Sequence, residues 1–324
     1  MKFGKISKIV AGLLVTATIA QADLTANFNG IKGNANDASK AFIKKVDSIG
    51  FQSAGNDNIQ VHYFNRYKEK NLDLLSFFTV TNLTVMRDLL IKNPNFGAYA
   101  PFNMLFYKKL DKDEKITWYG HLDPDLMLNI VGEKDEANRK TFKDMIAPLD
   151  ELAKKELNPT EFKKLEHTDK LPAKPLTKMV MKLPADLKDS DAISEWVEEF
   201  VETHDGAFVK HEFIIAGFLD FKFEYEDAEI DFDAYDAYWV SSLCHFKFSN
   251  SVFNHNEPQA GLFAPCSVYF YIPKGSKELH VGYSSVENWL ATTGIKDEKM
   301  RKDMLAIDAE VVETFKELGF TLEK

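Results

Sequence analysis

The chain is poor in cysteine: Cys244 and Cys266 are the only two thiol residues among 324. This count excludes a small scaffold stapled by several disulfides, in which cysteine makes up about a tenth of the chain. Hydrophobic residues make up 45% of the sequence and charged residues 28%, an ordinary balance for a globular protein. The fold must therefore be held by a hydrophobic core, and any thiol chemistry depends on this one pair.

The sequence also lacks the short motifs of the common cofactor-dependent and hydrolytic enzymes. It contains no Gly-rich phosphate-binding loop, no H-E-x-x-H zinc motif, no C-x-x-C-H haem attachment motif and no G-x-S-x-G nucleophile turn. No cofactor or metal is therefore indicated by a linear motif. An active site assembled from residues far apart in the chain leaves no such motif, so an enzyme is not excluded.

Basic residues are fewer than acidic residues. The chain has 40 lysines and arginines against 50 aspartates and glutamates, which gives a formal net charge of −10. Proteins that bind nucleic acid or an anionic membrane surface depend on an excess of positive charge. We therefore expect no nucleic-acid partner, and a protein or a small ligand remains the expected class of partner.

Residues 1–22 have the pattern of a secretory signal peptide. Lysines precede the apolar run Ile9–Val15, which is followed by the small-residue cleavage site Ala20-Gln21-Ala22. The apolar run is too short for a membrane span, which needs about 20 residues. We expect a mature chain that begins at Asp23, has no stable membrane insertion, and is periplasmic or secreted, where cysteines can pair.

An internal repeat relates the two halves of the sequence. The segment Pro94–Pro101 recurs as Pro258–Pro265, with both prolines, the glycine, the aromatic residue and the alanine in register. Further on, Gly132–Glu136 matches Gly294–Glu298, and a basic pair follows each. Agreement over this many positions indicates that one structural unit has been duplicated.

The repeat predicts two modules joined by a linker. The first module is predicted to span residues 23–156 and the second 177–324, and residues 157–176, rich in proline and lysine, would connect them. Helical and strand-like patterns alternate irregularly in each module, and a hairpin follows the repeated segment. We therefore predict an α+β fold of two tandem two-layer α/β sandwich modules with mainly antiparallel sheets.

Segments dense in β-branched and aromatic residues are predicted strands. They are residues 59–64 and 77–80 in the first module, and 213–223 and 238–243 in the second. The alternating segment 177–182 and its counterpart 24–28 are predicted to be edge strands. A helix is predicted over residues 142–152, and Pro148 is expected to kink or break it.

The spacing of the two cysteines in the second module is similar to that of a known protein family. Cys244 ends a predicted strand, and about one helix later Ala264–Tyr269, with Pro265-Cys266, opens the next strand. This spacing resembles the domain of unknown function 302 family. The first module looks like a diverged copy, with Thr81-Asn82 where that family has Cys-Asn and Phe102 where it has the second cysteine. The resemblance implies a compact α+β fold in two tandem copies and no established reaction.

The second module also holds the candidate functional cluster of the chain. The cluster consists of Cys244, His245, Cys266 and His280. Thiol and imidazole groups are the nucleophiles and ligands of redox, metal and haem sites. The corresponding residues of the first module, Thr81, Phe102 and Trp118, lack that chemistry. One functional and one supporting module are therefore expected.

Two interpretations of the thiols remain open. If the strand ending at Leu243 and the strand starting at Cys266 are antiparallel neighbours, Cys244 and Cys266 come close enough for a structural disulfide. If they are not, Cys244 near a helix N-terminus would have a lowered pKa and act as a reactive thiolate or ligand, assisted by His245 and His280.

The charged stretch from His121 to Asp125 has a simple structural explanation. Asp123 followed by Pro124 is typical of a helix N-cap and first helical position. We expect this stretch to begin a helix rather than to form a site.

Three classes of function remain open. The absence of catalytic motifs favours an exported binding or interaction protein with a structural or redox cysteine pair. The second class is a redox or metal- or haem-binding protein that uses the cluster of Cys244, His245, Cys266 and His280. The third class is an enzyme whose active site is not visible in the sequence.

Overall fold

The computed structural model of the protein describes residues 22–56, 58–111, 115–187, 189–255 and 257–323. The predicted signal peptide, residues 1–22, lies outside the described residues except for Ala22. Within the described ranges, no helix has both the length and the apolar character that crossing a bilayer requires.

The chain forms two six-stranded sheets with the same strand order. The first sheet is ordered β2-β3-β4-β5-β1-β6, and the second, read in the same sense, β8-β9-β10-β11-β7-β12. All pairings are antiparallel, so the predicted α+β class with mainly antiparallel sheets is confirmed. The strands are β1 Asp23–Lys32, β2 Gln52–Asn56, β3 Leu72–Thr81, β4 Phe102–Lys109, β5 Ile116–Gly120, β6 Glu161–His167, β7 Leu176–Lys182, β8 Phe213–Asp220, β9 Tyr235–His245, β10 Cys266–Pro273, β11 Glu278–Ser284 and β12 Thr321–Leu322.

We call residues 23–167, which contain β1 to β6, the first unit, and residues 176–322, which contain β7 to β12, the second unit. The helices of the first unit are α1 Asn36–Ile43, η1 Val46–Ile49, α2 Gln60–Tyr67, α3 Leu83–Lys92, η2 Pro94–Tyr99, α4 Pro124–Ile130 and α5 Glu136–Leu157. Those of the second unit are α6 Ser190–Lys210, α7 Phe221–Asp227, α8 Phe246–Phe253, η3 Pro258–Phe263, α9 Val286–Thr292 and α10 Glu298–Glu317. The 3-10 helices η2 and η3 contain the repeated segment and precede the fourth strand of each unit.

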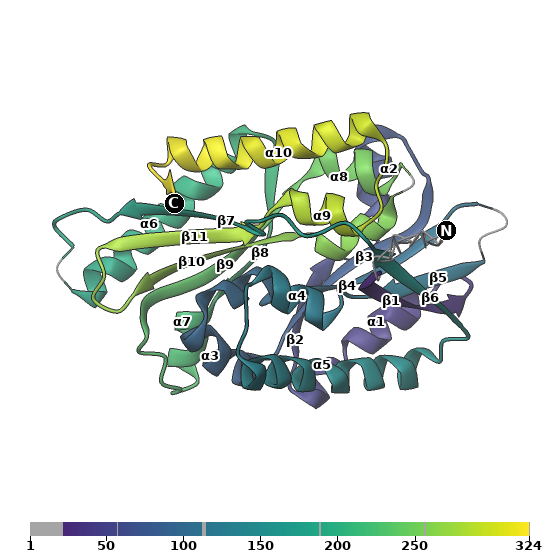
Figure 1. The fold of residues 1–324 in the computed structure, drawn as a ribbon, viewed down its shortest axis with the longest axis horizontal. Helices are drawn as coiled ribbons and strands as arrows, with labels where there is room; N and C mark the ends of the chain where they lie inside the picture. The colour runs from purple at the N-terminus through teal and green to yellow at the C-terminus, as the bar shows by residue number, and fades with distance from the viewer. Residues whose placement is uncertain (1–21, 57, 112–114, 188, 256, 324) are drawn as a thin grey trace, which may run out of the picture.

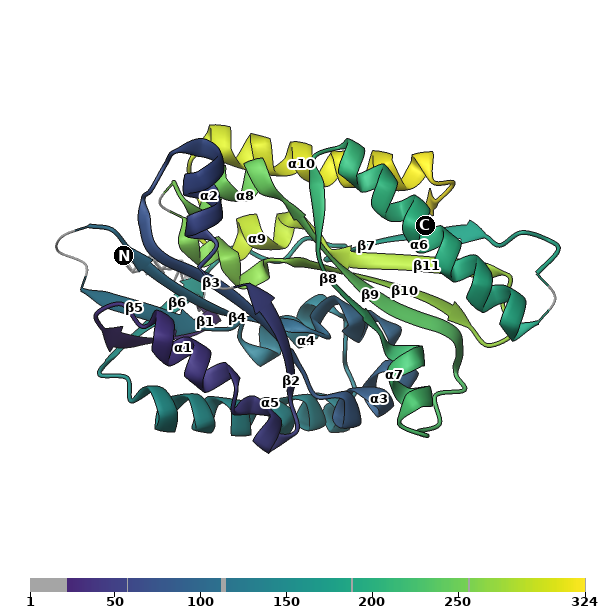
Figure 2. The ribbon, with the colours of Figure 1, turned by 180° about the vertical axis from the view of Figure 1, so that it is seen from behind.

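The long helices α5 and α10 cover opposite sides of the molecule. Figure 1 shows α10 along one long edge and α5 along the other, with both sheets between them, and Figure 2 shows the same arrangement from behind. Between the second sheet and its helices, Phe200 of α6 and Phe315 of α10 pack against Trp239 and Phe270. Each fully buried aromatic side chain stabilises the fold by about 2 kcal/mol, so these layers hold each unit together.

The inner faces of the two sheets pack on each other through η2 and η3. A side chain at Gly97 of η2 would overlap Tyr238 and Tyr269 of the second sheet, and one at Gly261 of η3 would overlap Phe77 of the first sheet. Glycine is therefore required at both positions because backbone and sheet are in direct contact. Each unit thus inserts its 3-10 helix against the sheet of the other.

Tyrosine hydroxyls of the second unit fasten this interface. They donate hydrogen bonds to acceptors on α3 and η2 of the first unit: Tyr225 to Leu83 O, Tyr235 to Leu90 O, Tyr238 to Pro94 O and Tyr269 to Asn95 Oδ1, over 2.6 to 2.8 Å. A buried hydroxyl left without a partner costs about 1–3 kcal/mol, so these bonds fix how the two units dock.

The segment 59–64, predicted as a strand, is instead part of α2. Gln60 and Tyr63 are buried whereas Val61 and Phe64 are exposed, a period of three to four residues rather than two. The segment was mistaken for a strand because its β-branched and aromatic residues have strand propensity, which packing overrides here. The strand predicted over 213–223 ends at Asp220, whose carboxylate accepts from Phe223 N at 3.0 Å and caps α7.

The two predicted edge strands lie inside their sheets. β1 has β5 on one side and β6 on the other, and β7 lies between β11 and β12. β6 occupies residues 161–167, within the range predicted as linker. It was missed because its lysines and glutamates hide the strand pattern, a composition that protects sheet edges from aggregation. α5 continues unbroken through Pro148, since Phe142, Ile146 and Leu149 keep it docked on the core.

Candidate functional site

The predicted cysteines lie where β9 ends and β10 begins. These strands are antiparallel neighbours, and Cys266 lies directly opposite Leu243. Because successive residues of a strand point to opposite faces, Cys244 leaves the sheet on the face away from Cys266. Cys244 Sγ lies 3.7 Å from Ser249 Oγ of α8, and Cys266 is within electrostatic reach of both Cys244 and Asp308 of α10.

This register accounts for the state of the thiols, which are both free. Cysteines whose Cβ directions diverge cannot be bridged without moving the backbone, even when their Cα atoms are near. The predicted antiparallel arrangement is therefore confirmed, but the disulfide expected from it is not formed.

The environment of the thiols disfavours the alternative interpretation, a reactive thiolate. Burial raises the pKa of Cys244 to about 11, and the hydrogen bond with Ser249 offsets this only in part. Burial, together with repulsion from Cys244 and Asp308, also raises the pKa of Cys266. Both residues are protonated at neutral pH, the form that is weak as a nucleophile and as a metal ligand.

We expect two free thiols in freshly purified protein. Denatured protein should react at both Cys244 and Cys266 with a thiol reagent before any reductant is added, and native protein should react more slowly because both groups are half-buried and have a raised pKa. Thiol counting with and without denaturant and reductant measures this. Thiols that become reactive only after reduction would show a disulfide and contradict the expectation.

The two predicted histidines have structural roles at separate places. Nδ1 of His245 accepts from Phe248 N at 3.1 Å and caps α8, as Asn82 caps α3 in the first unit. His280 stacks on Tyr271, with ring centroids 4.8 Å apart, and its Nδ1 lies 2.9 Å from Glu323 Oε1. The structure therefore brings together Cys244, His245 and Cys266, but not His280.

A narrow cavity of about 40 Å³ lies beside the two cysteines. Its walls are predominantly apolar and come from the ends of β9, β10 and β11 and from α8, α9 and α10. Aromatic rings dominate: Phe213, Phe248, Phe253 and Trp289 line it together with Cys244, His245 and Cys266. Few polar side chains therefore line this cavity.

The conspicuous polar group is Asp308 of α10. Its Oδ1 is buried and has no hydrogen-bond partner within the described part of the chain. Burial raises the pKa of Asp308 to about 6, although the Val286 N–H and the Tyr283 hydroxyl act in the opposite direction. A carboxylate that is buried without a cation is costly, so its presence here needs an explanation.

The corresponding position of the first unit is apolar. Asp135 caps α5 and Asp297 caps α10, and counting from these caps places Asp308 at the position of Ile146, which is 1% exposed. Sequence reasoning missed Asp308, although the signal was present: it lies one turn from Met304 on the apolar stripe of its helix.

The residue equivalent to Cys266 also differs in the first unit, where it is Phe102. Phe102 lies opposite Val80 in the first sheet, as Cys266 lies opposite Leu243 in the second. The ring of Phe102 packs against Phe51, with centroids 6.4 Å apart. A cysteine at this position is much smaller than a phenylalanine, which leaves room for the cavity of the second unit.

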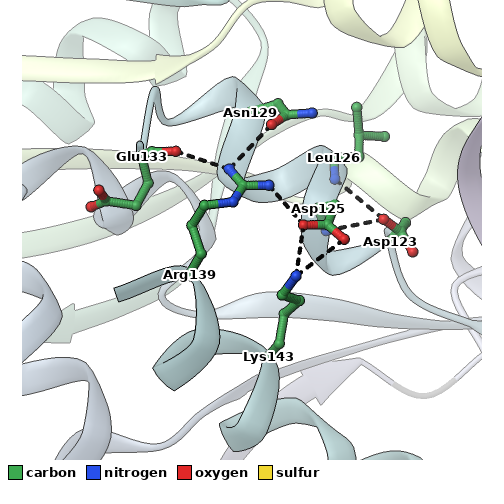
Figure 3. Close-up of polar contacts among 7 residues, drawn as sticks. All are labelled: Asp123, Asp125, Leu126, Asn129, Glu133, Arg139 and Lys143. Atoms are coloured by element: carbon green, nitrogen blue, oxygen red, sulfur yellow. Dashed lines mark hydrogen bonds and ion pairs between the residues drawn. The ribbon is translucent and has the colours of Figure 1, made fainter. Parts of the chain in front are cut away.

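The charged stretch after β5 begins α4, as predicted. Asp123 Oδ1 accepts from Asp125 N at 3.0 Å and Leu126 N at 3.3 Å, and Pro124 is the first helical residue. Figure 3 shows that Asp123 faces the first turn of the helix, and that Asp125 points instead toward Lys143.

Arg139 of α5 ties the end of α4 to the start of α5 (Figure 3). It donates to Asn129 Oδ1 at 3.2 Å, to Glu133 O at 2.9 Å and to Asp125 Oδ1 at 2.7 Å. In the second unit, Arg301 donates to the carbonyl oxygens of Leu290 and Ile295 at the same place. This network is present in both units and is structural.

The first unit has an ion pair near α4 in which the histidine is buried and the aspartate is partly exposed. His121 Nδ1 lies 2.7 Å from Leu122 O, and Nε2 lies 3.1 Å from Asp150 Oδ1. Since both neighbours are acceptors, both ring nitrogens must donate, which requires the charged imidazolium. Burial alone would lower the pKa of His121, but Asp150 and the Leu122 carbonyl outweigh it, and the pKa is raised.

We expect the His121–Asp150 pair to lose its stabilising effect at alkaline pH. Because the folded pKa of His121 is raised, the contribution is complete below about 6.5, the unfolded value, and is lost as the pH rises through the folded value. An NMR titration of the His121 ring in the wild type and in Asp150→Asn measures this. The variant should have a lower His121 pKa, and an unchanged value would contradict the assignment.

Among the described residues, no group of three or more histidine, cysteine, aspartate or glutamate side chains is placed to hold a metal ion. No protein-family profile matches the chain, and a search of curated proteins finds no match. Among solved structures, the chain is similar to an uncharacterized conserved protein, DUF302, from Bacillus stearothermophilus, with 13% identity and a TM-score of 0.34. The similarity covers 40% of this chain and 96% of that chain.

Proposed function

We propose that the protein is a binding protein for a small alkylammonium ion, which the second unit holds in its apolar cavity against the carboxylate of Asp308. The observation that carries this proposal is a half-buried carboxylate with one buried oxygen and no cationic partner within the described residues, in a cavity lined by aromatic rings. A protonated amine supplies the missing positive charge and up to three hydrogen-bond donors.

The energetic cost of Asp308 supports a ligand-binding role. An unpaired buried charge costs several kcal/mol, and replacing such a group by an apolar one of similar size usually stabilises a protein. The first unit has that apolar residue, Ile146. Residues that destabilise a fold are typical of functional sites, where the ligand supplies the missing interaction.

The shape of the site sets the size and polarity of the ligand. A single water needs about 10–15 Å³, so the inner cavity of about 40 Å³ takes an alkyl group of a few heavy atoms. Asp308 also lines an outer hollow of about 640 Å³, which includes Thr177, Ser285 and Glu287. The alkyl group would lie inside, the ammonium group at Asp308, and any remaining part in the outer hollow.

The aromatic walls support a cation over an anion. A cation near an aromatic ring gains about 0.5–2 kcal/mol, and Phe253 and Trp289 are among the rings that line the cavity. An anionic ligand would instead be repelled by Asp308 and Glu287. The geometry gives less support to a redox or metal-binding role for the thiols, because Cys244 and Cys266 are protonated and leave the sheet on opposite faces.

Isothermal titration with isobutylamine at pH 7.5 tests the proposal, with isobutyl alcohol as the neutral counterpart. The amine should bind at least about tenfold more tightly than the alcohol, since a paired buried charge is worth more than a neutral hydrogen bond. Its binding should weaken as the pH falls below about 6, because Asp308 then becomes protonated.

Two variants make the test specific to the cavity. Asp308→Asn keeps the shape and should abolish the preference for the amine over the alcohol. Cys266→Phe introduces the residue that the first unit has at this position and should remove binding of both compounds by filling the cavity. Equal binding of amine and alcohol by the wild type, or full amine binding by folded Asp308→Asn, would overturn the proposal.

We also propose that the protein is exported and that cleavage after Ala22 leaves Asp23 as the first residue. The lysines, apolar run and Ala20-Gln21-Ala22 boundary support this. The intact mass of protein recovered from the exported fraction measures the cleavage site. A mass that still includes residues 1–22 would contradict it.

Finally, we propose that the two units are diverged copies of one unit of the DUF302 type. The in-register repeat, the Cys…Pro-Cys spacing and the identical strand order support this proposal. An experimentally determined structure provides the test: Pro101 and Pro265 should coincide when the units are superposed, and non-equivalent positions would contradict duplication.

A further inference from the structure

The first unit has a hollow of about 470 Å³ at the place where the second unit has its outer hollow. The sheet register shows the correspondence. Phe162 of β6 pairs with Asn29 of β1, as Leu322 of β12 pairs with Met179 of β7. The residue that follows is Lys163 in β6 of the first unit and Glu323, just after β12, in the second, and both line their hollows.

The sign of the charge is reversed between the two hollows. Lysines line the hollow of the first unit: Lys154 of α5 and Lys163 and Lys164 of β6. In the other hollow the carboxylates of Asp308, Glu287 and Glu323 outnumber two lysines, Lys174 and Lys178, and Lys178 is paired with Glu323. Three lysines lining one hollow stand out in a chain whose formal net charge is −10.

The lysines differ in how they are held. Lys163 is fixed in place: its Nζ donates to the Tyr107 hydroxyl at 2.7 Å and lies 3.9 Å from the centre of the Trp118 ring. Lys154 and Lys164 form no ion pair within the described residues, and both line the hollow, one from α5 and one from β6. Two unpaired cations that converge from different elements suit one anionic group between them.

The carboxylates of this hollow are already engaged. Asp150 pairs with the imidazolium of His121, and Asp123 accepts the N–H groups that begin α4. Asp150 also acts on Lys154 electrostatically but is shared with His121, and no ion pair of either carboxylate with Lys164 is found within the described residues. The hollow retains an excess of positive charge and a doubly protonated imidazole beside it.

An exposed aromatic side chain completes the site. Phe162 is 68% exposed, and it lines the hollow beside Lys164's strand partner, Asn27. A phenyl ring left in water next to cationic groups is available to contact a flat apolar group.

We propose that this hollow is a second binding site, which takes an aromatic carboxylate: the carboxylate group lies between Lys154 and Lys164, and the aromatic ring lies against Phe162. The site is in the first unit and does not share residues with the cavity at Asp308. A test of this second site is therefore independent of a test of the proposed function.

NMR titration of the intact protein with benzoate tests this, with benzamide as the neutral isostere and acetate as the anion without a ring. Benzoate should bind about tenfold more tightly than either compound and should shift the ring signals of His121, which lines the site. Binding should weaken in 0.5 M salt, where exposed charges are screened.

The double variant Lys154→Gln/Lys164→Gln should lose benzoate affinity about tenfold, whereas Lys155→Gln, the neighbouring lysine on α5 that does not line the hollow, should behave as the wild type. Phe162→Ser should lower affinity for benzoate but not for acetate. Benzamide binding as tightly as benzoate, acetate binding as tightly as benzoate, or full benzoate affinity in the folded double variant would each overturn the proposal.

Discussion

Replacing Gly97 by alanine is expected to destabilise the protein by about 3 kcal/mol, because the added methyl group overpacks the interface between the units. A Cβ at this position would lie 2.2 Å from the Tyr238 hydroxyl oxygen and 2.4 Å from Tyr269 Cβ. Neither tyrosine can retreat easily, since both are fully buried and both are hydrogen-bonded to η2. Urea unfolding followed by tryptophan fluorescence measures the change in free energy.

Gly206→Ala is the matched control. Gly206 lies in α6, and nothing is within 4 Å of the position that its Cβ would take. Alanine there should leave the protein as stable or stabilise it by about 0.5–1 kcal/mol, because glycine is unfavourable inside a helix. Equal stability of the two variants would contradict the inference that η2 packs closely on the second sheet.

Replacing Asp308 by isoleucine is expected to stabilise the protein by about 3 kcal/mol at pH 7.5 while abolishing alkylammonium binding. The pKa of Asp308 is raised from 3.8 to about 6 in the folded protein, and each unit of pKa corresponds to about 1.4 kcal/mol. Because the folded pKa is the higher one, the penalty is absent below pH 3.8, grows as the pH rises to about 6, and is constant above it.

The pH dependence separates this effect from a general change in packing. Relative to Asp308→Asn, the wild type should lose stability between about pH 4 and pH 6.5. Asp303→Asn, at a more exposed position on the same helix, provides the control and should follow the wild type. Parallel pH profiles for the wild type and Asp308→Asn would show that the carboxyl group does not titrate as inferred.

The fold could be predicted where patterns repeat. The recurrence of Pro94–Pro101 as Pro258–Pro265 indicated two similar halves, and η2 and η3 occupy the same place in two sheets of identical order. Prediction failed where local propensity and tertiary packing disagree. Strand-like residues form α2 because one helical face docks on the core, and β6 is a strand because β1 offers it an open edge.

The sequence predicted where the candidate site lies but not which residues give it its chemistry. Cysteine spacing pointed to the junction of β9 and β10, which borders the cavity. The disulfide considered for Cys244 and Cys266 is not formed, because a one-residue offset in strand register, invisible in the sequence, directs the thiols to opposite faces. Asp308 was overlooked because one acid within a helix is unremarkable until the neighbours that bury it are known.

The reciprocal insertion of η2 and η3 changes the role of the segment 168–175 that joins the units. Docking is held by groups that belong to the units themselves, such as Tyr238 and Gly261, and of that segment Leu171 packs against the same core. The segment then acts as a tether that raises the local concentration of one half around the other, typically to the millimolar range. A protease cut there would leave a nicked protein whose fragments stay associated, much as two subunits do.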